Sequence, residues 1–352
     1  MAQRILVIQQ QMIGDVLVSS LLCNELRKLY PGAVIDYMIY EHTLPVVQHN
    51  PNISHYILYN ESSSLRETIR QIKHNKYDVI IDAYSKLGTA AMCLFSGAGT
   101  TIGFEKWYTK FCYKHTWKQK NKAATHAGLA IENRIALLNF LQPVPVPAKM
   151  PPVYLTADEI AAAKKNLDNH QLANKPLIMI SLLGSGQLKS YPAKYMAEIL
   201  DAIAANSAAA LLFNYIPSQQ TEAAEIVRLC RPETVMKAAT GLQPQNLRSF
   251  LAVLCHCKAL IGNEGGAVNM AKALDIPTFS IFSPMAGKEA WDLFGDGSKH
   301  VSVHLRDFNP GAFMNLDKKQ VKQQSPDLYE QFVPALIKPE LLRFLREHEL
   351  MN

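Results

Sequence analysis

The sequence contains two series of short apolar runs that alternate with amphipathic segments, and this alternation limits the fold more than any other feature. In the first series the apolar runs are residues 5–8, 33–40, 55–58 and 78–82. Continuous apolar runs of this length are typical of parallel strands buried on both faces. The segments 15–30 and 65–75 place Leu, Ile and Val at helical spacing. Strands and helices in this order predict a doubly wound parallel sheet.

A proline-rich stretch separates the two series. Its prolines are Pro143, Pro145, Pro147, Pro151 and Pro152. Proline cannot occupy the interior of a helix or of a central strand, so this stretch is expected to be an extended linker. The alternation then resumes, with strands expected at 177–182, 208–213, 259–262 and 278–282. We therefore expect two α/β domains, residues 1–150 and 151–335, with a ligand cleft between them.

The composition excludes several classes of protein. With 352 residues, 48% hydrophobic and 19% charged, the chain can bury two cores and is not generally disordered. No run of 18 apolar residues exists, and the apolar run at 4–8 is too short for a signal peptide. Six scattered cysteines favour a reducing cytoplasm over a disulfide scaffold. Cys255-His256-Cys257 lacks a second ligand pair, so we expect a helix end there and no metal site.

The net charge of +6 is concentrated in one segment. Residues 105–122 carry six lysines and one glutamate, and Lys106, Lys110, Lys114 and Lys118 recur every four residues among aromatic residues. A helix here would carry a lysine stripe suited to an anionic membrane surface or to acceptor phosphates. A solvated helix with aromatics in the core explains the pattern as well. No nucleic-acid-binding motif accompanies it.

The loop after the first strand ends in Gly14-Asp15. Gly14 is the only glycine of this loop, so a dinucleotide fingerprint is not present. Asp15 at the start of a helix is either an N-cap or a carboxylate base that the helix N-terminus keeps ionised.

Two glycine-containing turns in the second half follow strands and precede helices. The first contains Ser185, Gly186 and Lys189, and the second contains Glu264, Gly265, Gly266 and Asn269. Backbone N–H groups in such turns, a helix N-terminus and a lysine can bind phosphate. Each turn alone could also be a simple connection, but two in one domain suggest a nucleoside diphosphate.

Taken together, these segments resemble the ADP-heptose:lipopolysaccharide heptosyltransferases of glycosyltransferase family 9. The resemblance spans roughly residues 3–290 and rests on three motifs: Gly14-Asp15-Val16, Lys189-Ser190-Tyr191-Pro192, and the segment from Glu264 to Asn269 with the alanine-rich helix and Ile276-Pro277 after it. Phe282-Ser283-Pro284 resembles the family's Phe-Gly-Pro.

The resemblance implies a GT-B fold, in which two Rossmann-like domains face each other and a C-terminal segment, here 336–352, crosses back to the first domain. It implies inverting transfer of a heptose from ADP-heptose to the lipopolysaccharide inner core, on a lipid A–Kdo acceptor, without a metal or cofactor. Asp15 matches the general base, and Lys189 with the two turns would bind the donor diphosphate. His126 and Arg134 are candidates for holding an anionic acceptor. Such an enzyme would work at the cytoplasmic face of the inner membrane.

The third motif departs from the family pattern, because the usual Asp and His are Glu264 and Asn269 here. A basic residue common in the first loop is replaced by Gln9. Two alternatives therefore stand beside the transferase. One is a non-catalytic protein of envelope assembly that binds nucleotide sugars on the same scaffold. The other is an enzyme that uses a different nucleotide sugar, including an epimerase that needs no acceptor.

Overall fold

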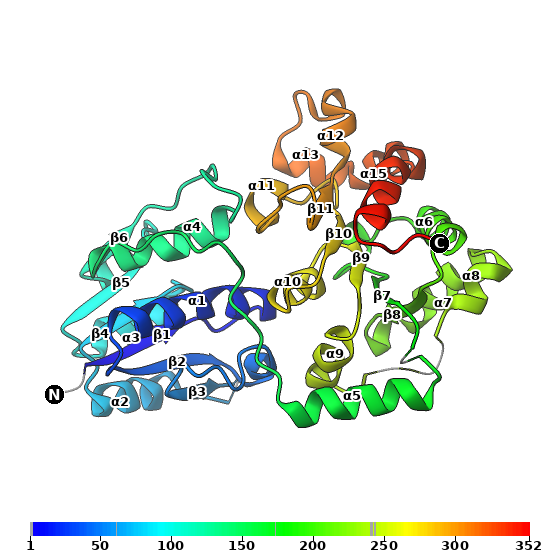
Figure 1. Ribbon diagram of the computed structural model, residues 1–352. Helices are drawn as coiled ribbons and strands as arrows, with labels where there is room; N and C mark the ends of the chain where they lie inside the picture. The colour runs from blue at the N-terminus through cyan, green and yellow to red at the C-terminus, as the bar shows by residue number, and fades with distance from the viewer. Residues whose placement is uncertain (1–2, 61, 173, 240–241, 243) are drawn as a thin grey trace. The chain divides into compact units, whose positions relative to one another are not determined.

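The computed structural model describes residues 3–60, 62–172, 174–239, 242 and 244–352. The chain divides into two compact units (Figure 1). Unit 1 comprises Met1–Tyr154 and Glu289–Phe294, and unit 2 comprises Leu155–Lys288 and Gly295–Asn352. The short return of Glu289–Phe294 to unit 1 was not anticipated from the sequence. The last helix, which we expected to cross back to the first domain, is instead grouped with unit 2.

Unit 1 is built on one parallel sheet of six strands in the order β3-β2-β1-β4-β5-β6. The strands are β1 (Arg4–Ile8), β2 (Val34–Tyr40), β3 (His55–Tyr59), β4 (Val79–Asp82), β5 (Thr100–Phe104) and β6 (His115–Trp117). The helices are α1 (Ile13–Leu29), α2 (Leu65–Asn75), α3 (Leu87–Phe95) and α4 (Leu129–Ala136), with short turns η1 (Glu41–Val46), η2 (Lys110–Cys112) and η3 (Leu137–Phe140). Helix α1 packs beside α4, and α2 packs beside α3 (Figure 1).

The elements of unit 1 form where apolar side chains can be buried. Strand β1 is buried from Ile5 to Ile8 because it has a hydrogen-bonded neighbour on each side, β2 and β4, and helices over the sheet. The expected helix 65–75 forms as α2, capped by the Ser64 hydroxyl, which accepts from the Glu67 N–H. The predicted doubly wound order is confirmed for this half of the chain.

Unit 2 repeats the plan with a parallel sheet of five strands in the order β11-β10-β9-β7-β8. These strands are β7 (Leu177–Ser181), β8 (Ala210–Asn214), β9 (Ala259–Asn263), β10 (Thr278–Ile281) and β11 (His300–Val303). The longer helices are α5 (Ala157–Asn169), α6 (Ala193–Asn206), α7 (Gln220–Leu229), α9 (Leu247–Leu254), α10 (Gly266–Ala273) and α15 (Pro334–Glu347). Shorter elements are η4 (Gln187–Lys189), η5 (Pro217–Gln219), α8 (Pro232–Lys237), α12 (Leu305–Phe308), η6 (Pro310–Phe313), α13 (Lys318–Gln323) and α14 (Ser325–Gln331). The short helix α11 (Lys288–Trp291) begins at the last residue of this part of unit 2 and otherwise belongs to unit 1.

Helix α15 belongs to the core of unit 2. It packs against α6, and its Ile337, Leu341, Phe344 and Leu345 are fully buried in the same cluster as the strands. The capping box expected at Thr156 and Glu159 opens α5, with the Thr156 hydroxyl accepting from the Glu159 N–H at 3.2 Å.

The helix considered for residues 105–122 is wrong. The segment instead forms η2 and the edge strand β6. Tertiary contacts decide this outcome: the Tyr113 ring covers Gly103, where a Cβ would collide with it, and the Lys114 N–H donates to the Thr101 carbonyl at 3.1 Å. The lysines at every fourth position therefore do not share a helical face.

Candidate functional site

In unit 1 the candidate site lies where the strand order reverses. The chain proceeds from β1 outward through β2 and β3, then returns to β4 on the other side of β1. The loops after β1 and β4 diverge at such a point and leave a crevice, which is where α/β sheets bind ligands. A cavity of about 270 Å³ is present there, lined by Gln9, Gln11, Asp15, Ala83, Tyr84, Phe104, Lys106, Gln119, Leu129, Ala130, Asn133, Arg134, Ala290 and Trp291.

Asp15 enters this cavity from the first turn of α1. The N-cap is Met12 and Asp15 is the third helical residue, so the N-cap alternative for Asp15 is wrong. Its Oδ2 lies 3.5 Å from the Met12 backbone nitrogen, and its Oδ1 accepts a hydrogen bond of 2.6 Å from Arg134 Nη2. The side chain is 25% exposed. Asp15 thus lies beside both the positive end of the helix dipole and the guanidinium of Arg134.

Arg134 is held so that it can point at Asp15. It lies on α4, and its side chain is only 9% exposed. Its Nε donates to Ser19 Oγ at 2.6 Å and its Nη1 donates to the Ala130 carbonyl at 3.0 Å. Ser19 in turn donates to Gln9 Oε1 at 3.1 Å. One polar network thus ties the first loop, α1 and α4 together around the carboxylate.

Lys106 reaches the same cavity from the segment after β5. Its Nζ donates to the Ser85 carbonyl at 2.7 Å and lies 3.3 Å from the Tyr84 carbonyl. Burial lowers the pKa of Lys106, and the positive charge of Lys86 lowers it further. The loop that offers these carbonyls is shaped by buried Asp82, whose Oδ1 accepts the Ser85 N–H at 2.8 Å. Burial raises the pKa of Asp82.

The other residues proposed for the acceptor side are not part of this cavity. Gly14 is the second residue of α1. Lys110 lies in η2, and Lys114 donates to the Gly99 carbonyl at 2.5 Å, at the far end of β5. His126 lies in the segment before α4 and is exposed. The structure therefore brings Asp15, Lys106 and Arg134 together and leaves the remaining three basic residues outside.

In unit 2 both predicted turns follow adjacent strands at that sheet's reversal point. Strand β7 is followed outward by β8, and the chain returns to β9 on the other side of β7. The buried Asn263 joins the two turns. Its Oδ1 accepts the Tyr191 N–H at 2.7 Å, and its Nδ2 donates to the Leu182 carbonyl at 2.9 Å. Gly262 allows the close approach of β9 to β7, because a Cβ there would collide with the Ser181 carbonyl.

Glu264 and Lys189 carry opposite charges across these turns. The Oε1 of Glu264 is buried and has no hydrogen-bond partner among the residues that the structure describes. Burial raises the pKa of Glu264, and the charge of Lys189 opposes that rise. A buried carboxylate oxygen that accepts no hydrogen bond costs free energy, so this position is suited to a ligand that supplies a hydrogen-bond donor group.

The glycines of the second turn leave the helix N-terminus open. Helix α10 begins at Gly266 with Gly265 as N-cap at φ 151°, and a Cβ at Gly265 would meet no atom within 4 Å. Asn269 is buried in the first turn of α10. In the other glycine-containing turn, which follows β7, Ser185 and Gly186 are exposed just before η4, which contains Lys189. The two predicted donor motifs thus lie at the carboxyl ends of neighbouring strands.

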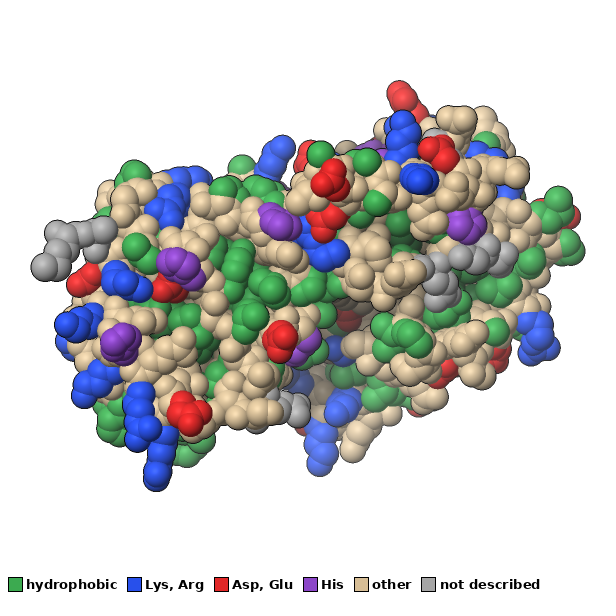
Figure 2. All heavy atoms as spheres, turned by 90° about the horizontal axis from the view of Figure 1, so that it is seen from below, with side chains coloured by type: hydrophobic (Ala, Val, Ile, Leu, Met, Phe, Trp, Pro, Cys, Tyr) green, Lys and Arg blue, Asp and Glu red, His purple; other side chains and the backbone are tan. Residues whose placement is uncertain are grey.

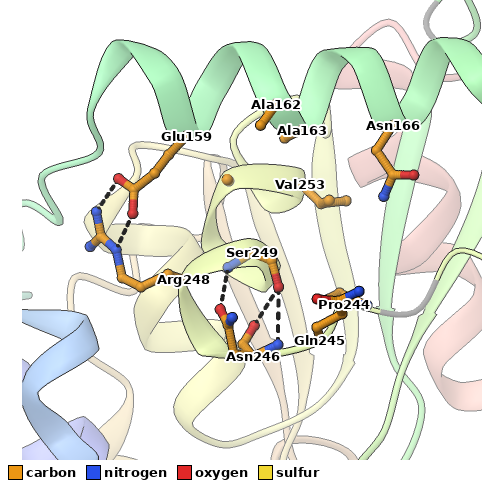
Figure 3. Close-up of a pocket in the computed structure, with 11 residues that line it drawn as sticks. Glu159, Ala162, Ala163, Asn166, Pro244, Gln245, Asn246, Arg248, Ser249 and Val253 are labelled. Atoms are coloured by element: carbon orange, nitrogen blue, oxygen red, sulfur yellow. Dashed lines mark hydrogen bonds and ion pairs between the residues drawn. The ribbon is translucent and has the colours of Figure 1, made fainter.

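A larger cavity of about 610 Å³ lies elsewhere in unit 2, between α5 and α9 (Figure 3). Arg248 Nε donates to Glu159 Oε1 at 2.7 Å, and a second bond joins Arg248 Nη2 to Glu159 Oε2. These bonds lower the pKa of Glu159 to about 2. No predicted site residue lines this cavity. At the end of α9, Cys255 and Cys257 donate to carbonyls of their own helix, and His256 bonds the Ile160 carbonyl.

Sequence reasoning missed several residues of the two sites. Ala290 and Trp291 reach the unit 1 cavity from a distant part of the chain. The anchoring role of Asn263 could have been suspected, because a polar residue ends an otherwise apolar strand just before Glu264. Among the described residues, no group of three or more His, Cys, Asp or Glu side chains is arranged to hold a metal ion.

The model of glycosyltransferase family 9 (heptosyltransferase) matches residues 65–308. The chain belongs to this family. Lipooligosaccharide heptosyltransferase 2 of Haemophilus ducreyi is 24% identical over 287 residues, which cover 78% of this chain and 81% of that protein. The chain is therefore a glycosyltransferase, as expected.

Solved structures agree on the fold. A family 9 glycosyl transferase from Veillonella parvula matches with a TM-score of 0.73 and 18% identity, over 94% of this chain and 97% of that one. The ADP-heptose lps heptosyltransferase II of E. coli matches with a TM-score of 0.69 and 19% identity, over 94% and 99%. The predicted GT-B class, with two Rossmann-like units, is confirmed. No helix in the described parts of the chain is both long and apolar enough to span a bilayer.

Proposed function

We propose that this chain transfers a heptose from ADP-heptose to the inner core of lipopolysaccharide. Family membership and the names of its relatives, which include lipooligosaccharide and lipopolysaccharide heptosyltransferases, support this proposal. The acceptor is of the lipid A–Kdo type, and the enzyme works as a peripheral protein at the anionic cytoplasmic face of the inner membrane. The observation that carries the proposal is the Asp15–Arg134 pair in the cavity of unit 1.

Asp15 acts as the general base. Arg134 occupies Oδ1 at 2.6 Å, while Oδ2 has only a long contact of 3.5 Å with the Met12 nitrogen. Oδ2 can therefore accept the proton of an acceptor hydroxyl as that oxygen attacks the anomeric carbon of the heptose. The bond from the anomeric carbon to the diphosphate breaks as the new glycosidic bond forms on the opposite side. One displacement of this kind inverts the anomeric configuration.

The turns of unit 2 bind the donor and stabilise the leaving diphosphate. Negative charge grows on the ADP oxygen as it departs, and fixed positive groups lower the barrier when they face that charge. Lys189 supplies a full charge, and the N-terminus of α10 at Gly265 and Gly266 supplies backbone N–H groups. These groups take the place that a metal ion holds in other transferases. The buried Oε1 of Glu264 accepts a hydrogen bond from a donor hydroxyl.

The decisive assay offers ADP-heptose and a lipid A–Kdo acceptor to the purified protein. Asp15→Asn is expected to abolish transfer while the protein still binds ADP-heptose, because the amide cannot take up a proton. Asp158→Asn is the matched control, since Asp158 is an exposed carboxylate in the first turn of α5. Full turnover by the Asp15 variant would remove this residue from the mechanism.

A second measurement tests the donor site. Lys189→Ala is expected to weaken ADP-heptose binding about tenfold or more, because an ion pair with a diphosphate is lost. Lys194→Ala is the control, as Lys194 is an exposed lysine of α6 that pairs with Glu330. Unchanged donor affinity in the Lys189 variant would contradict its role. Binding of nucleotide sugars without transfer of any of them would favour the non-catalytic alternative.

A further inference from the structure

Helix α3 exposes apolar side chains to solvent. Its sequence, residues 87–95, contains no charged residue. One side of the helix, with Ala90, Met92 and Cys93, is buried in the core of unit 1. The opposite side carries Leu87, Leu94 and Phe95, which are 67%, 48% and 59% exposed. These three residues, spaced i, i+7 and i+8, share one face of the helix.

The element beside α3 extends this apolar surface. Turn η2 packs against α3, and its Phe111 is 71% exposed. Trp107, in the turn that leads into η2, is 85% exposed. Large apolar side chains that gather on one surface, rather than standing singly, mark an interaction site. We name Leu87, Leu94, Phe95, Trp107 and Phe111 the α3 face.

Basic residues flank the α3 face on both sides. On one side α2 packs against α3 and exposes Arg66, Arg70 and Lys73 beside a single acidic residue, Glu67. On the other side η2 packs against α3 and exposes Lys110, and the exposed Lys86 is the N-cap of α3. Figure 2, which views the molecule from the α2 side, shows several Lys and Arg side chains gathered at the end of unit 1 near the N-terminus.

We propose that the α3 face docks on an anionic lipid bilayer. The apolar side chains of this surface can enter the boundary between lipid headgroups and acyl chains, while the basic side chains on either side contact the lipid phosphates. The surface is therefore complementary to such a membrane in both polarity and charge. A second copy of the chain is less well matched, because two α3 faces would bring their basic flanks together. The inference rests on the proposed function in one respect, which is that a lipid acceptor keeps the enzyme at a membrane.

The position of α3 relates this surface to the Asp15 cavity. Tyr84, which lines the cavity, lies three residues before Leu87 in the loop from β4 to α3. Lys106 lines the same cavity and directly precedes Trp107. Two segments of the cavity wall thus continue directly into the α3 face. A membrane bound there would hold the headgroup region, and with it the sugars of the acceptor, near the cavity mouth.

Vesicle flotation without any sugar substrate tests the proposal. The full chain is expected to float with phosphatidylglycerol-containing vesicles, to bind phosphatidylcholine vesicles much more weakly, and to lose binding as salt is raised. Leu94→Gln with Phe95→Gln is expected to weaken vesicle binding about tenfold or more, since two large apolar side chains no longer enter the bilayer. Met236→Gln is the control, because Met236 is an apolar residue on α8 of unit 2 that is even more exposed, at 85%.

The outcomes separate this inference from the proposed function. Unchanged vesicle binding by the α3 variant would overturn the inference. The inference would also be overturned if the parent protein bound no vesicles but formed a dimer, and the α3 variant did not form that dimer. The variant is also expected to keep its activity on a deacylated, water-soluble acceptor, which shows that its fold and its catalytic groups are intact. If the parent protein binds vesicles but transfers no heptose, the proposed function fails while the docking surface stands.

Discussion

Replacing Arg134 with methionine tests whether the network around Asp15 serves catalysis. Methionine fills a similar length of buried space but removes the bonds to Asp15 at 2.6 Å and to Ser19 at 2.6 Å. Asp15 then keeps its place in the first turn of α1 without the group that orients its Oδ1. In the proposed reaction Arg134 is a positioning residue, because it touches the carboxylate of Asp15 and would act only through it.

The expected magnitude follows from these contacts. A hydrogen bond that involves a charged group contributes about 1.5–3 kcal/mol, and the charged guanidinium donates both the bond to Asp15 and the bond to Ser19. The lower end applies to the ion pair, because a quarter of the Asp15 side chain remains in water. With both bonds near the lower end of this range, the free energy of unfolding should fall by about 3 kcal/mol. If the same contacts orient the base in the transition state, kcat should fall about a hundredfold while KM for the acceptor changes little.

The assay measures both quantities on the same variants. Arg27→Met is the control, because Arg27 bonds the carbonyls of Pro31 at 2.9 Å and Ala33 at 2.7 Å at the far end of α1. The Arg27→Met variant should lose a similar amount of free energy of unfolding as Arg134→Met but keep the kcat of the parent protein. Arg134→Lys should recover part of the activity, because one ammonium group can reach only one of the two partners. If Arg134→Met loses stability as Arg27→Met does but keeps kcat within about twofold, the network is structural and the reasoning is refuted.

Two further predictions concern acidic residues of unit 2. The bonds with Arg248 lower the pKa of Glu159 to about 2, so the pair stabilises the fold above pH 4.5 and this stabilisation is lost as the pH falls toward 2. Glu159→Gln should lower the free energy of unfolding by about 1–2 kcal/mol at pH 7, after allowance for solvent screening. If urea unfolding showed the same difference between the two proteins at the lowest pH, the assignment would be contradicted. Burial raises the pKa of Glu264, so its charged form destabilises the ligand-free fold above pH 4.5. Glu264→Gln should therefore weaken donor binding and raise the melting temperature at neutral pH, and the rise in melting temperature should shrink as the solution is acidified. A lower melting temperature of the variant at neutral pH would show that the protein itself already stabilises the charged carboxylate.

Much of the fold could be predicted because strands buried on both faces leave a simple pattern. The runs at 5–8 and 177–182 had no competing explanation, and they became β1 and β7 within one residue at either end. The helix expected at 105–122 is wrong because the fourfold spacing of the lysines is not the only period in this segment. Tyr113, His115 and Trp117 also alternate with a period of two, and the open edge beside β5 supplied the hydrogen bonds that favour a strand.

The candidate site could be predicted only in the part that lies in loops after strands. Asp15, Lys189 and Glu264 follow buried strands directly, so their place at the carboxyl edge of a sheet follows from the order of elements. The partner of Asp15 could not be predicted in this way, because Arg134 is separated from Asp15 by 119 residues in the sequence. Arg134 was proposed to hold an acceptor, whereas the structure engages it with three groups of the protein itself.

Why Arg134 is the partner follows from the topology of unit 1. The six strands place β1 in the middle of the sheet, and α4, which follows the edge strand β6, must return across the sheet to lie beside α1. Any residue on the face of α4 that meets the first turn of α1 is therefore buried against the carboxylate, and a buried residue there must be cationic or donate hydrogen bonds. An arginine meets this requirement and can bond Ser19 at the same time, which a lysine cannot. The surroundings of the carboxylate that we propose as the general base thus depend on the return of a distant helix.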